Sequence, residues 1–107
     1  MSSNGKTRLR RAEKNEQAFK AHNGRRAAME EAGHVPKDEP VPFACECDNS
    51  ECHEAIEVPL GEYEQAVKPV DRFVVAPGHE DPTVEVVVAQ RGTYLIVSKP
   101  DLKRRRA

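Results

Sequence analysis

The segment Phe43-Ala44-Cys45-Glu46-Cys47-Asp48-Asn49-Ser50-Glu51-Cys52 decides how this chain folds, because it contains all three cysteines of the sequence. Phe43, Cys45 and Cys47 alternate, so on a β-strand their side chains would face the same side. Asp48-Asn49-Ser50 is a turn-forming sequence that would return Cys52 toward the other two cysteines. The sequence therefore predicts that three thiols gather at one place.

The spacing C-x-C-x4-C indicates a metal site. Thiolate is a soft ligand that suits zinc, and structural zinc sites take four Cys or His ligands in a tetrahedron. Three cysteines cannot all pair in disulfides within the chain, and iron–sulfur clusters normally need four cysteines. We therefore expect Zn²⁺ bound by Cys45, Cys47 and Cys52. A regulatory thiol or disulfide and ordinary buried cysteines are the alternatives.

The fourth ligand is left open by the sequence. His79 is preferred, because it follows Pro77-Gly78, a turn that could swing its imidazole toward the cysteines. His53 adjoins Cys52, and adjacent residues of one strand point to opposite faces. Asp48 or a water molecule could complete the shell instead, which would leave the site open.

The segment 41–99 is predicted to form the folded body. Its apolar residues alternate as on strands, Gly61 to Val67 predicts a short helix, and Val84–Gln90 and Thr93–Ser98 predict a hairpin joined by Arg91-Gly92. We expect an α+β fold with a small antiparallel sheet of about five strands. With 37% hydrophobic residues and no Trp, a body this small needs a staple, and a zinc site would stabilise it.

Basic segments flank an acidic body. Residues 1–28 contain eight Lys or Arg against two Glu, whereas residues 37–90 contain three against thirteen Asp or Glu. Residues 1–40 are expected to be a basic arm, largely helical from Thr7 to about Ala32, with Gly33 as a C-cap and a Pro-rich linker after it. Its apolar positions are sparse and Asn23-Gly24 interrupts them, which predicts loose docking. Residues 100–107 are expected to be a basic, disordered tail.

Five short motifs resemble a family of small, functionally uncharacterised actinobacterial proteins. The motifs are Phe43-Ala-Cys-Glu-Cys, Cys52, Glu62-Tyr-Glu, Arg72-Phe-Val-Val-Ala-Pro-Gly-His-Glu80 and Tyr94-Leu-Ile-Val-Ser-Lys99. The resemblance covers roughly Phe43 to Lys99, and it implies that His79 is a ligand. It assigns no activity. The Ala-rich N-terminal helix, interrupted by Gly24, departs from the family pattern.

Two other features could carry chemistry. Pro77-Gly78-His79-Glu80 could form a catalytic loop with Glu80 orienting His79, but the sequence places no nucleophile beside it, so we expect no enzyme. Clustered basic residues could bind the phosphates of nucleic acid in a salt-dependent way. They are Arg8, Arg10, Arg11, Arg25, Arg26, Lys103, Arg104, Arg105 and Arg106.

The function expected from these features is that of a non-catalytic zinc-binding module that interacts with an unidentified protein partner or regulates it. One alternative is a nucleic-acid-associated accessory protein that uses its basic terminal arms. Another is a thiol-redox zinc switch in which Cys45-x-Cys47 releases the metal on oxidation. No apolar run approaches the roughly 20 residues of a membrane span, and no secretory signal is evident, so we expect a cytoplasmic protein.

Overall fold

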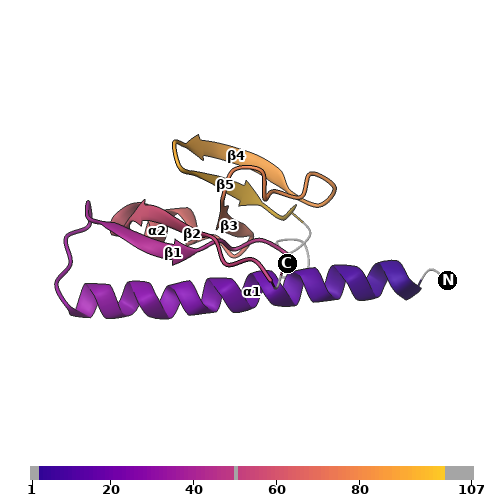
Figure 1. Cartoon of the computed structure of the whole chain (residues 1–107), viewed down its shortest axis with the longest axis horizontal. Coiled ribbons are helices and arrows are strands. Elements are labelled where there is room, and N and C mark those ends of the chain that lie inside the picture. Colours follow the sequence, from indigo (N-terminus) through magenta and orange to yellow (C-terminus); the bar gives the residue numbers. More distant parts are fainter. Residues whose placement is uncertain (1–2, 50, 101–107) are drawn as a thin grey trace.

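The structure, a computed structural model, describes residues 3–49 and 51–100, which form two helices and five strands (Figure 1). The predicted α+β class is confirmed. In chain order the elements are α1 (Ser3–Ala32), β1 (Pro40–Ala44), β2 (Ala55–Pro59), α2 (Leu60–Ala66), β3 (Arg72–Val75), β4 (Val86–Arg91) and β5 (Tyr94–Ser98). Apart from Pro100, the predicted tail 100–107 lies outside the described residues.

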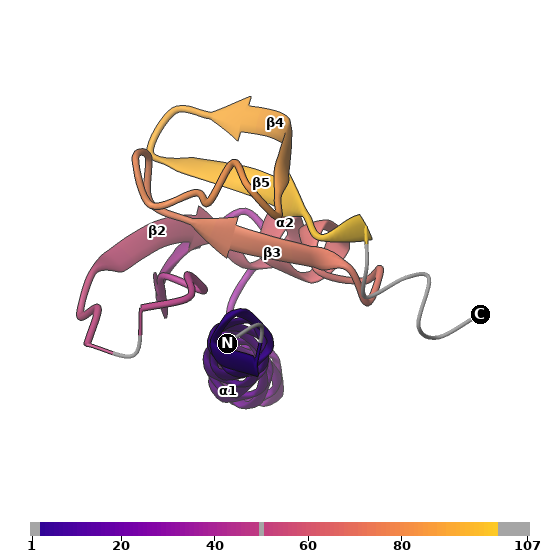
Figure 2. The same ribbon diagram turned by 90° about the vertical axis from the view of Figure 1, so that its right-hand side faces the viewer.

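The strands of the described chain form two antiparallel sheets, where the sequence suggested one. One sheet pairs β1 with β2, and the other has the order β3-β5-β4. The grouping differs from the expectation because α2 begins directly after β2 and takes the chain away from the first sheet. Figure 2, which looks along α1, shows β4 on the side of the molecule farthest from this helix.

The predicted hairpin is formed by β4 and β5, with its turn one residue later than expected. Arg91 and Tyr94 are the last paired residues, so the turn is Gly92-Thr93. Gly92 has φ 62°, a left-handed conformation that glycine adopts without steric cost. A glycine in this conformation at the first central position is typical of the type II′ turns that close two-residue hairpins.

The segment after β1 joins the two sheets. β1 ends at Ala44, so Cys45 and Cys47 lie beyond the strand on which the alternation had placed them. The Cys45 N–H donates to Glu54 O (3.0 Å), and the Glu46 N–H donates to Val74 O in β3 (2.8 Å). The backbone leaves β1 because these successive amides bond to different sheets. All three residues from Cys45 to Cys47 are buried.

Helix α1 lies along the whole body and accounts for the longest dimension of the molecule, 51 Å (Figure 1). A helix of 30 residues is about 45 Å long, from a rise of 1.5 Å per residue. The helix runs through Asn23-Gly24 without a break. It ends as predicted near Gly33, although the residue with positive φ is His34 (64°).

The buried face of α1 is polar. Glu16, Asn23 and Ala27 are buried, and Lys20 between them is half-buried, at spacings of four, three and four residues that align them along one side of the helix. By contrast, four alanines of the helix are exposed to solvent: Ala18, Ala21, Ala28 and Ala32. The helix therefore docks mainly through hydrogen-bonding side chains.

Two of these polar residues attach α1 to distant parts of the chain. Asn23 Nδ2 donates to Ala44 O (2.7 Å), while Asn23 Oδ1 accepts the Ala44 N–H (2.9 Å). Lys99 Nζ donates a hydrogen bond to Glu16 Oε1, and both side chains are almost completely buried. The expectation of loose docking is therefore wrong, because these buried groups would lose their partners if the helix detached.

Candidate metal site

The cysteines and His79 come from three separate segments. Cys45 and Cys47 follow β1, Cys52 lies in the loop that leads to β2, and His79 follows β3. The loop is closed by an Asx turn, in which Asn49 Oδ1 accepts the Glu51 N–H (3.0 Å). Asn49 O accepts the Cys52 N–H (3.0 Å), so this turn returns Cys52 toward the other thiols as the sequence predicted.

A tight turn positions His79. Its N–H donates to Ala76 O (3.0 Å) across Pro77 and Gly78. Gly78 has φ 89°, and the order Pro then Gly with this positive φ is typical of a type II turn. Glu80 Oε1 accepts the Gly78 N–H (2.8 Å), so this carboxylate stabilises the turn. The imidazole is thereby carried from the end of β3 toward the cysteines.

Cys45, Cys47, Cys52 and His79 form one cluster. Their ligand atoms, one from each residue, all lie within 4.8 Å of one another. His79 Nδ1 lies 3.6 Å from Cys45 Sγ and 3.5 Å from Cys52 Sγ. A tetrahedral zinc ion with Zn–S of about 2.3 Å and Zn–N of about 2.05 Å separates its sulfur and nitrogen ligands by about 3.6 Å. The four residues are thus close enough to bind a metal ion, and their spacing fits zinc.

The preference for His79 over His53 agrees with this geometry. His53 is exposed and lies outside the cluster, as expected for a residue adjacent to a ligand. Asp48, the other candidate, is half-buried, and burial raises the pKa of its carboxyl, together with the neighbouring Asp81 carboxyl. Among the described residues, the group close enough to hold a metal is the one with His79.

The environment of the thiols suits a cation. The Ala76 N–H donates to Cys45 Sγ (3.2 Å), and such contacts orient and stabilise a thiolate ligand. The hydrogen bond between Cys45 and Cys47 lowers the pKa of Cys47 to about 5, and the same bond together with burial raises the pKa of Cys45. A coordinated metal would deprotonate both thiols, because a metal ion removes the protons of its thiol ligands.

Glu46 is the structural residue that sequence reasoning missed. It stands between Cys45 and Cys47, and it is fully buried. Its carboxylate accepts hydrogen bonds from three elements: Asn23 Nδ2 (2.9 Å), Tyr63 Oη (2.5 Å) and the Val74 N–H (2.9 Å). Glu46 therefore fixes the backbone between two of the ligands. The sequence signal was a charged residue inside a C-x-C pair.

The basic residues do not join the cysteine cluster. The positions of Arg8, Arg10 and Arg11 lie on α1, as do Arg25 and Arg26, and a rise of 1.5 Å per residue separates Arg11 from Arg25 by about 21 Å along the axis. Arg25 is exposed, whereas Arg26 is half-buried and lies 3.9 Å from Glu30. Lys103, Arg104, Arg105 and Arg106 lie outside the described residues.

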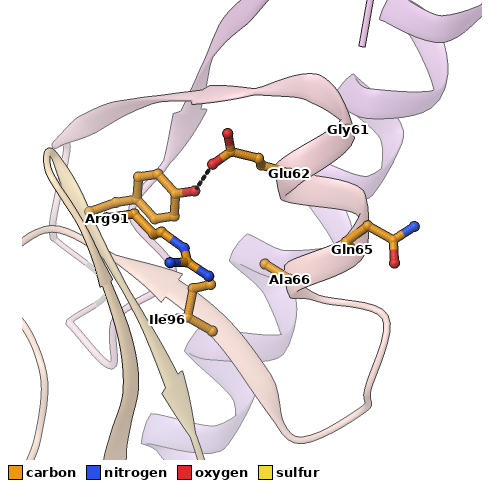
Figure 3. Close-up of a pocket in the computed structure, with 7 residues that line it drawn as sticks. Gly61, Glu62, Gln65, Ala66, Arg91 and Ile96 are labelled. Atoms are coloured by element: carbon orange, nitrogen blue, oxygen red, sulfur yellow. Dashed lines mark hydrogen bonds between the residues drawn. The ribbon is translucent and has the colours of Figure 1, made fainter. Parts of the chain in front are cut away.

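A pocket of about 720 Å³ lies between α2 and the β4-β5 hairpin (Figure 3). Tyr94 Oη donates to Glu62 Oε1 (2.6 Å), and both residues line the pocket together with Arg91 and Ile96. Burial and this carboxylate raise the pKa of Tyr94. None of the residues that line this pocket belongs to the cysteine cluster.

Comparisons with protein families, curated proteins and solved structures find no match for this chain. In the described part of the chain, no helix combines the length and the apolar character that crossing a membrane requires.

Proposed function

We propose that this chain is a zinc-binding protein in which Cys45, Cys47, Cys52 and His79 are the four ligands. The observation that carries this proposal is the pair of distances from His79 Nδ1 to the sulfurs of Cys45 and Cys52, 3.6 and 3.5 Å, which equal the sulfur–nitrogen edge of a tetrahedral zinc site. Three thiolates and one imidazole favour zinc over hard cations such as Mg²⁺ or Ca²⁺, which prefer oxygen ligands.

The proposed role of the metal is structural. Four protein ligands complete a tetrahedron and leave no open position for substrate, so we assign no enzymatic activity to this site. The ligands tie the segment after β1, the loop before β2 and the end of β3 to one point. Zinc would therefore stabilise the junction of the two sheets, and three free thiols suit the reducing cytoplasm.

With the metal in a structural role, the proposed function rests on surfaces, as an interaction or regulatory module for a protein partner. Two surfaces support this. One is the exposed side of α1, with Arg25 and Met29 (74% exposed). The other is the strand β4 at a sheet edge, whose residues Val86, Val87 and Val88 are 43–56% exposed. Exposed apolar groups of this kind are typical of protein contacts.

Elemental analysis of the purified protein tests the proposal directly. We expect about one zinc per chain. Cys52→Ser should lose the metal and unfold the body, as followed by circular dichroism, because the energy of metal binding is folding energy in small metal sites. Protein that is folded and metal-free after purification would contradict the proposal.

Nucleic-acid binding is a second candidate, favoured by the continuity of α1. Arg8, Arg10, Arg11, Arg25 and Arg26 all lie on this one unbroken helix. If they contact phosphates, affinity for duplex DNA or RNA should fall steeply with salt, and deletion of 103–106 should reduce the salt slope. Binding that is absent at low salt, or insensitive to salt, would exclude this candidate.

A further inference from the structure

The three cysteines of the cluster differ in their access to solvent. Cys45 is 1% exposed and Cys47 is 2% exposed, whereas Cys52 is half-buried at the margin of the core. The rate at which a thiolate is oxidised depends on its access as well as on its ionisation. Since all three would be thiolates in a zinc site, access is the property that separates them.

A pocket of about 470 Å³ leads to Cys52. α1 forms one wall with Ala18, Phe19 and His22, and the opposite wall includes Cys52 itself and Ala55 at the start of β2. Neither Cys45 nor Cys47 lines this pocket. A small oxidant can therefore reach Cys52 through an opening between α1 and the loop that carries this cysteine. Cys47 lines a different pocket, of about 390 Å³, but it is itself only 2% exposed.

Cys45 is also enclosed by the backbone. The Ala76 N–H donates to Cys45 Sγ at 3.2 Å, so the segment after β3 lies against this sulfur. Cys45 is thus shielded from an oxidant.

We propose that Cys52 is the site at which peroxides modify this protein, and that its oxidation opens the metal site. The inference rests on the proposed zinc site and names the residue at which that site is regulated. It replaces Cys45-x-Cys47, the pair that the sequence suggested, with the third cysteine.

The chemistry needs hydrogen peroxide or an alkyl hydroperoxide as the oxidant. Cys52 Sγ attacks one peroxide oxygen, an S–O bond forms, and the O–O bond breaks with loss of hydroxide or alkoxide, which takes a proton from solvent. Cys52 is oxidised to the sulfenic acid and the peroxide is reduced to water or an alcohol. A neighbouring cysteine thiolate then attacks the Cys52 sulfur, an S–S bond forms, the S–O bond breaks, and water leaves with a proton from solvent.

The cluster is arranged for this second step. The sulfurs of Cys45 and Cys47 lie within 4.8 Å of Cys52 Sγ, so either of them can reach Cys52 through a small side-chain movement. A disulfide removes two of the four ligands. The remaining cysteine and His79 would then be too few to retain zinc, which prefers four ligands.

The experiment treats the zinc-loaded full chain with hydrogen peroxide and follows two readouts. A sulfenic-acid trap with peptide mass spectrometry identifies the first residue oxidised, and a colorimetric chelator measures released zinc. We expect Cys52 to be trapped first and about one zinc to be released per chain. Oxidation that begins at Cys45 or Cys47, or trapping at Cys52 with full retention of zinc, would overturn the inference.

Variants of residues that line the pocket change the access of an oxidant to Cys52 without changing the metal ligands. Ala18→Leu should narrow the opening and slow trapping at Cys52 by a factor of about three or more. Ala28→Leu is the matched control, because Ala28 is exposed on the same helix and does not line the pocket. Equal rates in the two variants would contradict the proposed route.

The inference and the proposed function fail in different ways. If the purified protein binds no zinc, the proposed function is wrong. If it binds about one zinc per chain and peroxide attacks another residue, only the inference is wrong.

Discussion

The Tyr63 hydroxyl donates a hydrogen bond to Glu46 Oε2 at 2.5 Å, which joins α2 to the residue between two cysteines of the proposed metal site. Both side chains are buried, and the Tyr63 ring stacks on Phe43 with 4.1 Å between ring centroids. Burial raises the pKa of Glu46, while the hydrogen bonds from Tyr63, Asn23 and Val74 lower it. This carboxylate connects α1, α2 and β3 at the base of the site.

We expect Glu46→Gln to destabilise the fold and weaken metal binding. The Glu46 carboxylate accepts from three donors, and a glutamine would direct its own NH₂ at one of them. Leaving a buried donor without an acceptor should cost about 1–3 kcal/mol in the free energy of unfolding. Urea denaturation of the zinc-loaded protein measures this loss, and Glu51→Gln, at an exposed position, is the control.

A double-mutant cycle with Tyr63 tests the same hydrogen bond from its donor side. Tyr63→Phe removes one donor and should cost about 1–2 kcal/mol on its own. In the Glu46→Gln background it should cost less, because its partner is already altered. Costs that add fully in the double variant would show that the 2.5 Å contact carries no coupling energy.

We expect zinc binding to require His79 but not His53. His79→Ala should lower zinc affinity by more than about a hundredfold, a larger effect than loss of an outer-shell partner, because a ligand is lost. His53→Ala removes an exposed imidazole next to Cys52 and should leave affinity unchanged. Competition with a chromophoric chelator measures both. A similar loss in both variants would mean that His79 has no special role.

The stability of the fold should depend on pH through Glu16, whose carboxyl is buried near that of Glu85. Burial raises the pKa of Glu16 from 4.5 to about 9, helped by the Glu85 carboxyl and opposed by the Lys99 ammonium. Between these two values the folded protein binds a proton that the unfolded chain does not. Stability from this group is therefore fully present below pH 4.5 and is lost as the pH rises toward 9.

Glu16→Gln tests this, since an amide does not titrate. From about pH 6 to about pH 8, the wild type should lose stability relative to the variant by up to about 1.4 kcal/mol per pH unit. Both proteins are kept saturated with zinc, so that the contribution of the thiols cancels in the difference. If the stabilities of the wild type and the variant change equally with pH across this range, the raised pKa of Glu16 is contradicted.

We expect Lys20→Met to loosen α1 from the body. Lys20 Nζ donates to the carbonyls of Pro69 (3.1 Å), Val70 (3.3 Å) and Arg72 (2.8 Å). Methionine preserves much of the apolar stem but leaves these carbonyls without their donor, which should cost about 1–3 kcal/mol. Hydrogen exchange of the α1 amides should accelerate. Lys14→Met, at an exposed position of the same helix, should change neither the free energy of unfolding nor the exchange rate of these amides.

Local features of the body followed from the sequence because each depends on neighbouring residues. Pro77-Gly78 specified the turn that carries His79, and Gly92 specified the hairpin turn. The alternation of Ile56 and Val58 predicted β2, whose register places Ile56 opposite Phe43. The cysteine spacing and the preferred histidine followed in the same way, since donor chemistry is a property of the residues themselves.

The docking of α1 could not be predicted from neighbouring residues. Hydrophobic periodicity identifies a helix face that is buried by apolar contact, whereas this helix is buried through Glu16, Lys20 and Asn23. Whether such residues face solvent or protein depends on partners far along the chain, such as Lys99, 83 residues from Glu16. The role of Glu46 could not be predicted for the same reason, because its donors come from three distant elements.

The sequence by itself determined the donor set, the turns and the strands around the C-x-C-x4-C segment, because these depend on the chemistry and spacing of nearby residues. Only the tertiary structure decided that the two sheets meet at Glu46, that α1 belongs to the body, and that Cys52 is the most exposed cysteine of the cluster. These properties depend on which polar groups are desolvated together, and that depends on residues brought together by folding.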